Sequence, residues 1–600
     1  MTFVSEHDKR RISPASLRRL FGQYRPEAKL TALTTVLSVA SSLAELAPAV
    51  LIRNAINYLD MSIKLPGRAE VVIWPFVAAI ALMALIHGLL RFVQTLARAE
   101  LTVRIANGLR ERMYRAVQRH SLTYHKKTTT GDLIARSTRD IQSIARFVGF
   151  GVFAAADLVI FLGGACAVLL WINPVFALIA LCPLPLVLFL VVRSSARVRG
   201  LWRETSESYA KVTTVVQENV AGARVVRAFA QEHAERAKFV DRADAYVGKA
   251  IASVRFWVVR TLSSNFVFGM IIPLALLYGS YQVMGGRIEI GDIVLCFFYM
   301  RPVEHRLRHL MNMAEVYQSG AAGAERVFEV LDEEPSIASN PGARPAPRPA
   351  EKAGAAVEFR NVSFGYAPGK PVLRDISFRA GPGETVGIVG HTGSGKSTLI
   401  SLIPRFHDPT DGTVTLNGVD VRDIRLRELR RSVGMIFQET FLFSASVREN
   451  IAYGRPGADF EAIQAAARAA RADDFIRELE DGYDAVVGDR GVTLSGGQAQ
   501  RIAIARAVLL DPQVLVLDDA TASVDSETER LIRETVRGVA QGRTSFVVAH
   551  RVSSVAHADR ILVLDGGRVA EQGTHRELFA LGGIYRRMCD QQFTGGHDDG

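Results

Sequence analysis

The hydrophobic pattern changes character between the two halves of the chain. The first half contains six apolar stretches of roughly the 20 residues that a helix needs to cross a bilayer. They cover approximately residues 30–52, 71–93, 147–171, 174–192, 263–284 and 292–314. A soluble helical core rarely sustains so many runs of this length, so the pattern predicts six membrane-spanning helices.

The polar segments that follow the second and fourth apolar stretches keep a helical periodicity. Residues 96–145 and 193–255 contain no proline and few glycines, so they lack the composition of loops. We expect the spans to continue beyond the membrane as helical hairpins that turn near residues 130–133 and 221–225. Short transverse helices at these turns could dock on a soluble partner domain, although a plain helical hairpin explains each turn taken alone. At the N-terminus, Ser13-Pro14 and the spaced apolar residues after it predict a short helix on the inner leaflet.

Charge indicates the orientation in the membrane. The 600-residue chain carries a formal net charge of +11, which by itself suggests a nucleic-acid or membrane-surface partner. Lysine and arginine are concentrated before the first apolar stretch and in segments 96–145 and 193–255. The positive-inside rule therefore places the N-terminus and both long segments in the cytoplasm. Because membrane orientation accounts for most of the positive charge, no nucleic-acid partner is needed.

Charged residues share one arc of the helical wheel in the sixth apolar stretch. The arc includes Arg301, Glu304, His305 and Arg308, whereas Arg306 falls outside it. Charges at membrane depth are costly and normally face a wet cavity or one another. Two interpretations stay open: the arc lines a path for a polar or charged substrate, or it is a cytoplasmic helix end or a structural salt-bridge face. Glu45, in the first stretch, is a further candidate for the path.

A proline-rich segment separates the apolar half from a half with mixed strand and helix patterns. Residues 335–349 read PSIASNPGARPAPRP, which is typical of an exposed connector. We predict a multidomain chain in which an all-α polytopic membrane domain precedes an α/β nucleotide-binding domain. The expected boundaries are 1–29 for a cytoplasmic N-terminus, 30–330 for the membrane domain, 331–356 for the linker, 357–590 for the α/β domain and 591–600 for the tail.

A glycine-rich loop in the second half has the context of a phosphate-binding loop. The apolar run ETVGIVG predicts a strand, and the sequence after the loop predicts a helix. The loop consists of Gly390, His391, Thr392, Gly393, Ser394, Gly395, Lys396, Ser397 and Thr398. Glycines let backbone N–H groups converge on phosphate oxygens, and the helix N-terminus adds partial positive charge. In this pattern Lys396 would reach the β- and γ-phosphates and Ser397 would hold Mg²⁺.

Two further motifs fit nucleotide chemistry. The buried strand VLVLD ends at Asp518, whose carboxylate can hold the Mg²⁺ that bridges a nucleotide. The sequence Ser495, Gly496, Gly497 and Gln498 opens a helix and offers a second anion site. One nucleotide cannot use both sites of a single domain, so the second site would cover a nucleotide on another copy or a partner. An ordinary helix cap is the alternative.

Together these motifs resemble those of the ATP-binding cassette transporters over nearly the whole chain. Residues 390–398 resemble the Walker A motif of that family, 514–519 its Walker B motif and 494–498 its LSGGQ motif. The resemblance extends to Tyr366 as the aromatic that stacks on adenine, Gln438 as the Q-loop glutamine that senses Mg²⁺, Asp525 as the D-loop aspartate and His550 as the switch histidine. It implies an exporter-type half-transporter that uses ATP and Mg²⁺ and works with two membrane and two nucleotide domains.

One position departs from the pattern of the family. The residue after the Mg²⁺ aspartate is usually a glutamate that orients the attacking water, and here it is Asp519, which is one methylene shorter. A displacement of about 1 Å can slow catalysis on the order of a hundredfold. We therefore predict that the site on this chain's own Walker A motif binds ATP and hydrolyses it slowly. This favours a heterodimer whose other chain carries a catalytic glutamate, and a slow homodimer is the alternative.

The resemblance implies ATP-driven export or flipping of a polar or amphipathic small molecule, lipid or peptide. It also implies a multi-pass protein of the bacterial inner membrane with both termini in the cytoplasm and with membrane lipid around it. Alternatives on the same scaffold are a siderophore-type importer, a homodimeric lipid or drug exporter, and an ATP-gated channel or regulatory subunit. A soluble mechanical ATPase is disfavoured by the apolar stretches.

Overall fold

The structure is a computed structural model that describes residues 14–64, 72–347, 354–488, 494–519, 526–549 and 551–594. The chain divides into two compact units. The first comprises Met1–Gln118 and Thr130–Glu333, and the second comprises Arg119–Thr129 and Glu334–Gly600. Each unit is described by itself.

Within the described residues of the first unit, every regular secondary-structure element is a helix. Its α-helices are α1 (Pro14–Gly22), α2 (Ala28–Ala44), α3 (Ala47–Lys64), α4 (Trp74–Arg119), α6 (Thr130–Ala135), α7 (Ile141–Arg146), α8 (Val152–Ile172), α9 (Pro174–Leu181), α10 (Pro183–Ala221), α11 (Ala223–Ala228), α12 (Glu232–Gly269), α13 (Ile271–Met284) and α14 (Ile290–Asp332). Two π-helical turns, η2 (Arg136–Asp140) and η3 (Phe147–Gly151), flank α7. Local chemistry fixes the start of helix α9. The Asn173 side chain accepts hydrogen bonds from two backbone N–H groups there, and Pro174 occupies the first helical position.

Three helical segments of the described residues are long and apolar enough to cross a membrane. They are Ala28–Lys64, Trp74–Arg119 and Thr130–Ile172, which contain the first three predicted spans. The other three predicted spans lie on α9–α10, α12–α13 and α14, and of these helices only Ile271–Met284 stands out as a shorter apolar helix within the described part. Three apolar spanning segments are thus found, and the count of six stays a prediction.

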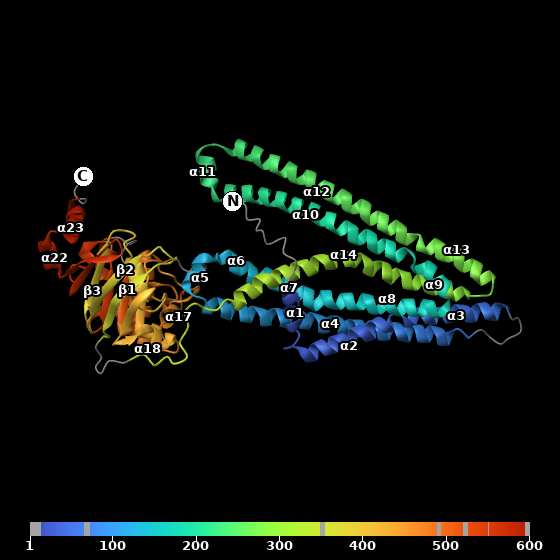
Figure 1. Cartoon of the computed structure of the whole chain (residues 1–600), viewed down its shortest axis with the longest axis horizontal. Helices are drawn as coiled ribbons and strands as arrows, with labels where there is room; N and C mark the ends of the chain where they lie inside the picture. Colours follow the sequence, from blue (N-terminus) through green and yellow to red (C-terminus); the bar gives the residue numbers. More distant parts are fainter. Residues whose placement is uncertain are drawn as a thin grey trace. The chain divides into compact units, whose positions relative to one another are not determined.

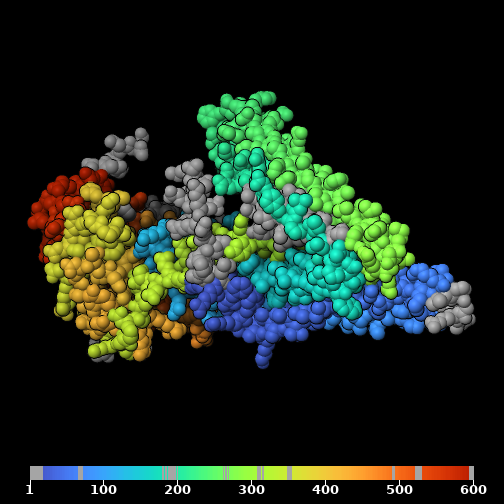
Figure 2. All heavy atoms as spheres, turned by 45° about the vertical axis from the view of Figure 1, so that its right-hand side comes forward, coloured from blue at the N-terminus to red at the C-terminus, as the bar shows by residue number. Residues whose placement is uncertain are grey.

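The helices continue well beyond a bilayer, as the periodicity of the polar segments predicted. Helix α4 has 46 residues, which at a rise of 1.5 Å per residue corresponds to about 70 Å, more than twice the hydrocarbon thickness. Helices α10 and α12 pack along each other as a second hairpin, and the short helix α11 crosses its end (Figure 1). The tip of this arm forms an outer surface of the unit in Figure 2. It exposes Val220, Val225 and Phe229.

The core of the first unit is built around α14, which packs on α3, α7 and α8. The buried carboxylate of Asp140 accepts two hydrogen bonds of 2.7 Å from the Arg326 guanidinium, which joins η2 to α14. At Gly149 in η3, an added Cβ would lie 1.9 Å from Oγ1 of Thr102, so only glycine permits this approach to α4. The predicted N-terminal helix exists as α1, where Leu20 is buried and Phe21 is exposed. Part of its apolar face therefore packs on protein, including α14.

The described part of the second unit contains three sheets, a small one of β7 and β8 and two larger ones that lie against a common apolar core. The six-stranded sheet has the order β12-β11-β3-β10-β9-β6, and the four-stranded sheet has the order β2-β1-β4-β5. The strands are β1 (Val357–Phe364), β2 (Leu373–Ala380), β3 (Thr385–Gly390), β4 (Asp411–Leu416), β5 (Val419–Asp420), β6 (Val433–Ile436), β7 (Ala445–Ser446), β8 (Val486–Val487), β9 (Val514–Asp518), β10 (Thr544–Val548), β11 (Arg560–Asp565) and β12 (Arg568–Gly573). Phe359 and Phe378 from the smaller sheet and Phe546 from the larger one are buried in the shared core.

Helices complete the second unit. They are α5 (Leu122–Lys127), α15 (Lys396–Ser401), α16 (Leu426–Ser432), α17 (Val447–Ala452), α18 (Phe460–Ala469), α19 (Asp473–Glu478), α20 (Gly496–Leu510), α21 (Ser526–Ala540), α22 (His575–Leu581) and α23 (Ile584–Thr594), with the 3-10 turns η4 (Val421–Asp423), η5 (Gly482–Asp484) and η6 (Val552–Ser554). A second apolar core forms where α17, α18 and α20 pack on one another, with Ile451, Ile463 and Ile502 buried in it. The α/β architecture predicted for this half is confirmed.

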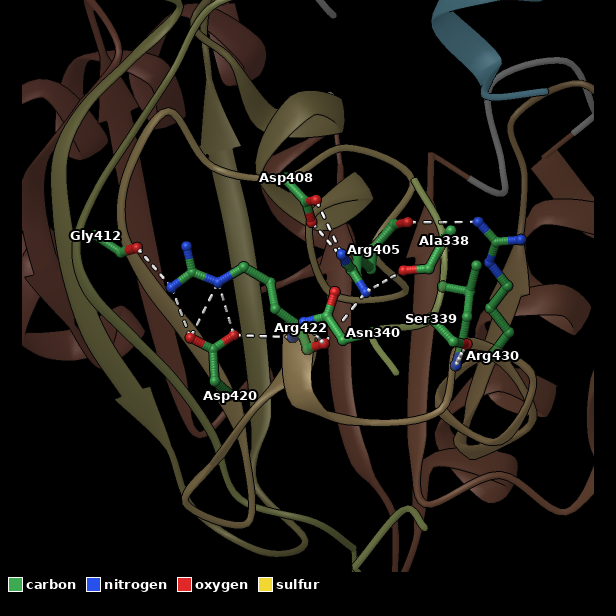
Figure 3. A network of polar contacts seen from close by, with 10 residues as sticks. Ala338, Ser339, Asn340, Arg405, Asp408, Gly412, Asp420, Arg422 and Arg430 are labelled. Carbon is green, nitrogen blue, oxygen red and sulfur yellow. Dashed lines mark hydrogen bonds and ion pairs between the residues drawn. The ribbon is translucent and has the colours of Figure 1, made fainter. Parts of the chain in front are cut away.

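The connector is less free than its composition suggested. Its described part, residues 334–347, follows the surface of the α/β unit and forms a parallel β-bridge between Arg344 and Ile424. Figure 3 shows Arg405 donating to the Ala338 carbonyl over 3.1 Å and to the Asp408 carboxylate over 2.7 Å. The buried guanidinium of Arg405 thus ties the connector to the α/β unit, although most connector side chains are exposed.

Candidate functional site

The candidate site lies at one edge of the six-stranded sheet, where its five parallel strands end. Strands β11, β3, β10, β9 and β6 are neighbours and run in the same direction. Their carboxyl ends therefore meet at one edge, which is where open α/β sheets bind ligands. Strand β3 leads into the glycine-rich loop, β9 ends at Asp518, and β6 ends two residues before the exposed Gln438. The fold thus brings together motifs that are far apart in the sequence.

The glycine-rich loop has a conformation that only glycines fit. Gly393 and Gly395 have φ angles of 85° and 103°, in the left-handed region that favours glycine. A Cβ on Gly390 would lie 2.2 Å from the Leu564 carbonyl oxygen. The hydroxyl of Ser394 is buried in the loop without a hydrogen-bond partner among the described residues. A cradle that excludes side chains and leaves a buried hydroxyl unsatisfied fits the oxygens of a phosphate ligand.

Lys396 and Ser397 begin α15 and face this cradle. The Lys396 ammonium donates to the carbonyl oxygens of Gly390 and His391 over 2.8 and 3.0 Å. Burial lowers its pKa from the ordinary value, and the nearby Asp519 and Asp518 carboxylates oppose that shift. The Ser397 hydroxyl donates to the Asp518 carboxylate over 2.9 Å. A hydroxyl beside a carboxylate is the hard oxygen donor set that Mg²⁺ prefers, so these residues fit a Mg²⁺–nucleotide.

Asp519 follows directly and is buried, with 6% of its surface exposed. Its backbone has a φ of 44°, a left-handed conformation that aspartate tolerates better than most residues. Its N–H donates to the Val548 carbonyl over 3.0 Å, which ties the residue to the end of β10. The backbone of Asp519 is therefore held by the neighbouring strand and cannot shift to compensate for a short side chain.

An aromatic group lies on the other side of α15. The Tyr366 hydroxyl is 3.1 Å from the hydroxyl of Thr398, and the ring remains 43% exposed. Lys126 of α5 places its ammonium 5.0 Å from the centre of that ring, a cation–π distance. The buried His407 packs between Tyr366 and Phe364 with ring centroids 5.3 Å from each. Sequence reasoning singled out Tyr366 and missed Lys126 and His407, because nothing in their spacing shows that α5 packs here.

His407 also contacts α5 through the Thr123 hydroxyl, which lies 3.3 Å from its Nδ1 atom. Burial is the main cause that lowers the pKa of His407, and the positive charge of Lys126 lowers it further. Asp408 opposes both effects. The imidazole is therefore biased toward its neutral form by the elements that surround it.

The second anion motif begins α20. The Ser495 hydroxyl accepts from the Gln498 N–H over 3.2 Å, and the Gln498 side chain accepts from the Ser495 N–H over 2.9 Å. This reciprocal capping box satisfies two N–H groups of the helix start within the chain. Gly496 is exposed beside it and leaves room for a ligand from outside. Asp525 and His550, which the sequence assigned to the same chemistry, lie outside the described residues.

The first unit contains a separate cavity of 410 Å³ among its helices. Glu45 and His305 line it, as the sequence suggested for a substrate path. Arg301 is exposed and is not among the lining residues, nor is Glu304, and the side chain of Arg308 lies outside the described residues. Arg306, placed outside the polar arc by the helical wheel, lines the cavity and pairs with Glu45.

Sequence reasoning missed three other charged residues of this cavity. Arg91 and Asp157 lie inside apolar stretches, and Arg98 follows the second one. Arg98 donates to the Asp157 carboxylate over 2.6 Å. The signal was present, because charges within spans are expensive and therefore informative. It was overlooked because each residue is isolated in its own stretch.

Comparisons with known families match both units. The model described as "ABC transporter transmembrane region" matches residues 31–302. The model described as "ABC transporter" matches residues 373–522, which include the glycine-rich loop and Asp518. These are the two parts that the hydrophobic pattern separated.

Relatives match over most of the chain, across both units. The chain is 36% identical over 576 residues to an ATP-dependent lipid A-core flippase of Syntrophus aciditrophicus (strain SB), covering 96% of this chain and 94% of the relative. It is 37% identical to a putative multidrug export ATP-binding/permease protein of Bacillus subtilis (strain 168), covering 80% and 82% of the two chains. Among solved structures, a bacterial Atm1-family ABC exporter with ATP bound matches with a TM-score of 0.78 and 29% identity, covering 94% of this chain and 98% of that one.

Proposed function

The chain belongs to the ATP-binding cassette transporters as a half-transporter of the exporter type, and we propose that it moves a polar or amphipathic substrate across the bacterial inner membrane. Exporters of this family couple ATP hydrolysis to transport, and their nucleotide domain binds the ATP. The observation that supports the role of ATP here is the cradle in which Lys396 and Ser397 meet Asp518 at the carboxyl edge of the sheet. ATP stabilises a conformation only by binding it better than the alternative, so closure of two nucleotide domains over ATP supplies the differential affinity that transport needs.

In this proposal the residues of the site have separate tasks. Lys396 neutralises phosphate charge, and the Ser397 hydroxyl with the Asp518 carboxylate would hold the Mg²⁺ that accompanies the nucleotide. Tyr366 offers its exposed ring to the base, and Gln438 would contact the metal from the end of β6. His550 and Asp525 keep the roles that the resemblance implies.

The test is Lys396→Ala in reconstituted vesicles. We expect loss of ATP-dependent substrate movement and strongly reduced ATP affinity, because one charge-assisted contact to phosphate is removed. Lys211→Ala, at an exposed lysine of the α10–α12 arm, is the matched control for the charge. Unchanged transport and nucleotide affinity in Lys396→Ala would overturn the proposal.

We propose further that the site on this chain hydrolyses ATP slowly and that the functional particle is a heterodimer. The support is Asp519, whose short carboxylate stands on a backbone tied to Val548. The capped LSGGQ start at Ser495 would then cover the active site of a partner that carries glutamate. Steady-state ATPase of the purified single chain tests this, since robust turnover would establish a competent homodimer instead.

A dimer is also supported by the arm of the first unit. Its tip exposes Val220, Val225 and Phe229, each more than half exposed. Exposed apolar groups at one place mark a protein interaction surface. A second half-transporter is the partner that we propose for this tip. We also propose that both termini of this chain lie in the cytoplasm and that lipid surrounds its spans.

A further inference from the structure

Arg405 has a backbone conformation that normally belongs to glycine. The turn after α15 is closed by the two backbone hydrogen bonds typical of a Schellman motif, from the Phe406 N–H to the Ser401 carbonyl over 3.0 Å and from the Arg405 N–H to the Leu402 carbonyl over 3.1 Å. Arg405 has a φ of 55°, in the left-handed region where an L side chain is strained. Such strain persists only where the surrounding structure holds it, and it is concentrated at functional positions. The side chain of Arg405 must therefore provide something that glycine would not.

The Arg405 side chain holds the connector. Its buried guanidinium donates to the Ala338 carbonyl over 3.1 Å and to the Arg422 carbonyl over 3.4 Å. Both carboxylate oxygens of Asp408 accept from the same guanidinium, over 2.7 and 3.1 Å, and so fix its plane. The Arg422 carbonyl also accepts from the Asn340 side chain over 3.0 Å, so Ala338 and Asn340 of the connector converge on one point of the α/β unit (Figure 3).

The connector continues along η4 and α16. The Arg344 N–H donates to the Asp423 carbonyl, and the Arg344 carbonyl accepts from the Arg425 N–H, both over 2.8 Å. Farther along the chain, the Ala346 N–H donates to the Glu428 carboxylate over 3.0 Å. The connector is thus bound over this whole stretch, and the guanidinium described above secures the end nearest to α14.

A short bridge joins this bound stretch to α14. The helix ends at Asp332, whose carboxylate pairs with Arg19 of α1. Residues 333–337 lie between that point and Ala338. The six steps between successive Cα atoms reach about 20 Å at full extension, so the length of the bridge is limited. A displacement of the end of α14 beyond that reach must therefore move the segment to which the connector is bound.

We propose that Arg405 is a positioning residue that makes the connector a route of coupling between α14 and the phosphate-binding loop. Arg405 lies four residues after α15, the helix that begins with Lys396 and Ser397 of the cradle. A nucleotide in the cradle therefore acts on a segment to which the end of α14 is tethered. His407, two residues farther on, contacts Thr123 of α5, so the same segment also meets the other stretch of chain that leaves the first unit. This role rests on the proposed transport function and adds a path of mechanical coupling to it.

The test compares ATP binding with the response of α14 in the full-length protein in lipid nanodiscs. Amide hydrogen exchange is followed with and without ATP and Mg²⁺. We expect Arg405→Gly to bind ATP with wild-type affinity, because glycine fits the backbone and the cradle is unchanged. Exchange in connector residues 338–346 should become about tenfold faster, the usual effect of one lost charge-assisted contact, and the ATP-induced change in α14 should fall several-fold. Arg427→Gln, exposed on α16, is the control for charge and should behave like the wild type.

A second variant lengthens the bridge and leaves Arg405 in place. Insertion of a flexible Gly-Ser-Gly-Ser segment between Glu334 and Pro335 should also weaken the response of α14 to ATP, while the bound connector keeps its slow exchange. A merely structural role of Arg405 predicts no effect of this insertion, which decides the question even where Arg405→Gly fails to fold. An unchanged response of α14 in either folded variant would overturn the proposal. A wild type that binds ATP without any response in α14 would overturn the proposed function as well, so the two failures are distinguishable.

Discussion

Asp519→Glu is expected to accelerate ATP hydrolysis by the isolated chain. The change adds one methylene, which extends the side chain by about 1.5 Å toward the edge of the sheet. The hydrogen bond of 3.0 Å from the backbone N–H of residue 519 to the Val548 carbonyl holds the backbone in place. Only a longer side chain can therefore bring the carboxylate closer to the attacking water. A misplacement of about 1 Å costs on the order of a hundredfold in rate, or about 2.7 kcal/mol.

The same substitution is expected to lower the stability of the folded domain, because the backbone at this position is strained for glutamate. Glutamate is less suited than aspartate to a φ of 44°, and the strain costs about 1 kcal/mol. We therefore expect turnover to rise by about 10- to 100-fold while the thermal midpoint falls by a few degrees. The assay is steady-state phosphate release by purified chains in lipid nanodiscs, with Lys396→Ala as the background.

Asp519→Asn tests whether Asp519 itself acts as a slow catalytic base, as in a slow homodimer, or contributes little to hydrolysis, as in a heterodimer. If Asp519 contributes little as a base, the amide leaves the low rate of the wild type nearly unchanged. Turnover of Asp519→Glu at or below the wild-type rate, with ATP binding retained, would refute the argument from side-chain reach.

Three further changes test the geometry of the fold. Gly390→Ala should abolish ATP binding and destabilise the nucleotide domain by about 3 kcal/mol, because the new Cβ would meet the Leu564 carbonyl at 2.2 Å; thermal unfolding and nucleotide binding check both. The lowered pKa of His407 means that the folded state binds fewer protons than the unfolded chain, so stability is full above about pH 6.5 and falls as the pH drops below it; His407→Asn should flatten this dependence in thermal melts. Arg326→Met should lower the free energy of unfolding by about 2 kcal/mol, because it leaves the buried carboxylate of Asp140 unpaired. Since Arg326 is half-exposed, this loss is smaller than for a fully buried pair. Arg326→Lys should keep part of the stabilisation in the same thermal melts.

Sequence alone predicted the features that depend on local order. The glycine-rich loop, the carboxylate at the end of a buried strand and the helical extension of α4 are contiguous patterns, so period and spacing are enough to find them. The capping box at Ser495 is likewise a local motif, and the structure confirms the helix cap. The second anion site at the same residues stays a prediction.

Features that depend on distant contacts were not predictable in this way. The wheel placed Arg306 away from the polar arc, because it assumes a straight helix and ignores neighbours. In the structure Pro302 interrupts the hydrogen bonding of α14, and Glu45 of another segment is the partner of Arg306. The attachment of the connector through Arg405 and the packing of His407 against α5 also require knowledge of which surfaces meet.

The position of α5 has a consequence for how the chain folds during synthesis. Thr123 and its partner His407 are 284 residues apart, yet α5 belongs to the same compact unit as the sheets. At about 5–20 residues per second, the ribosome needs roughly 15–60 s to produce the surface on which α5 will dock. The helix must wait for that interval without its final contacts, and a nucleotide domain excised at the connector would lack it altogether. Docking of α5 is therefore a late step of biogenesis, at which chaperones and proteases can distinguish finished chains from unfinished ones.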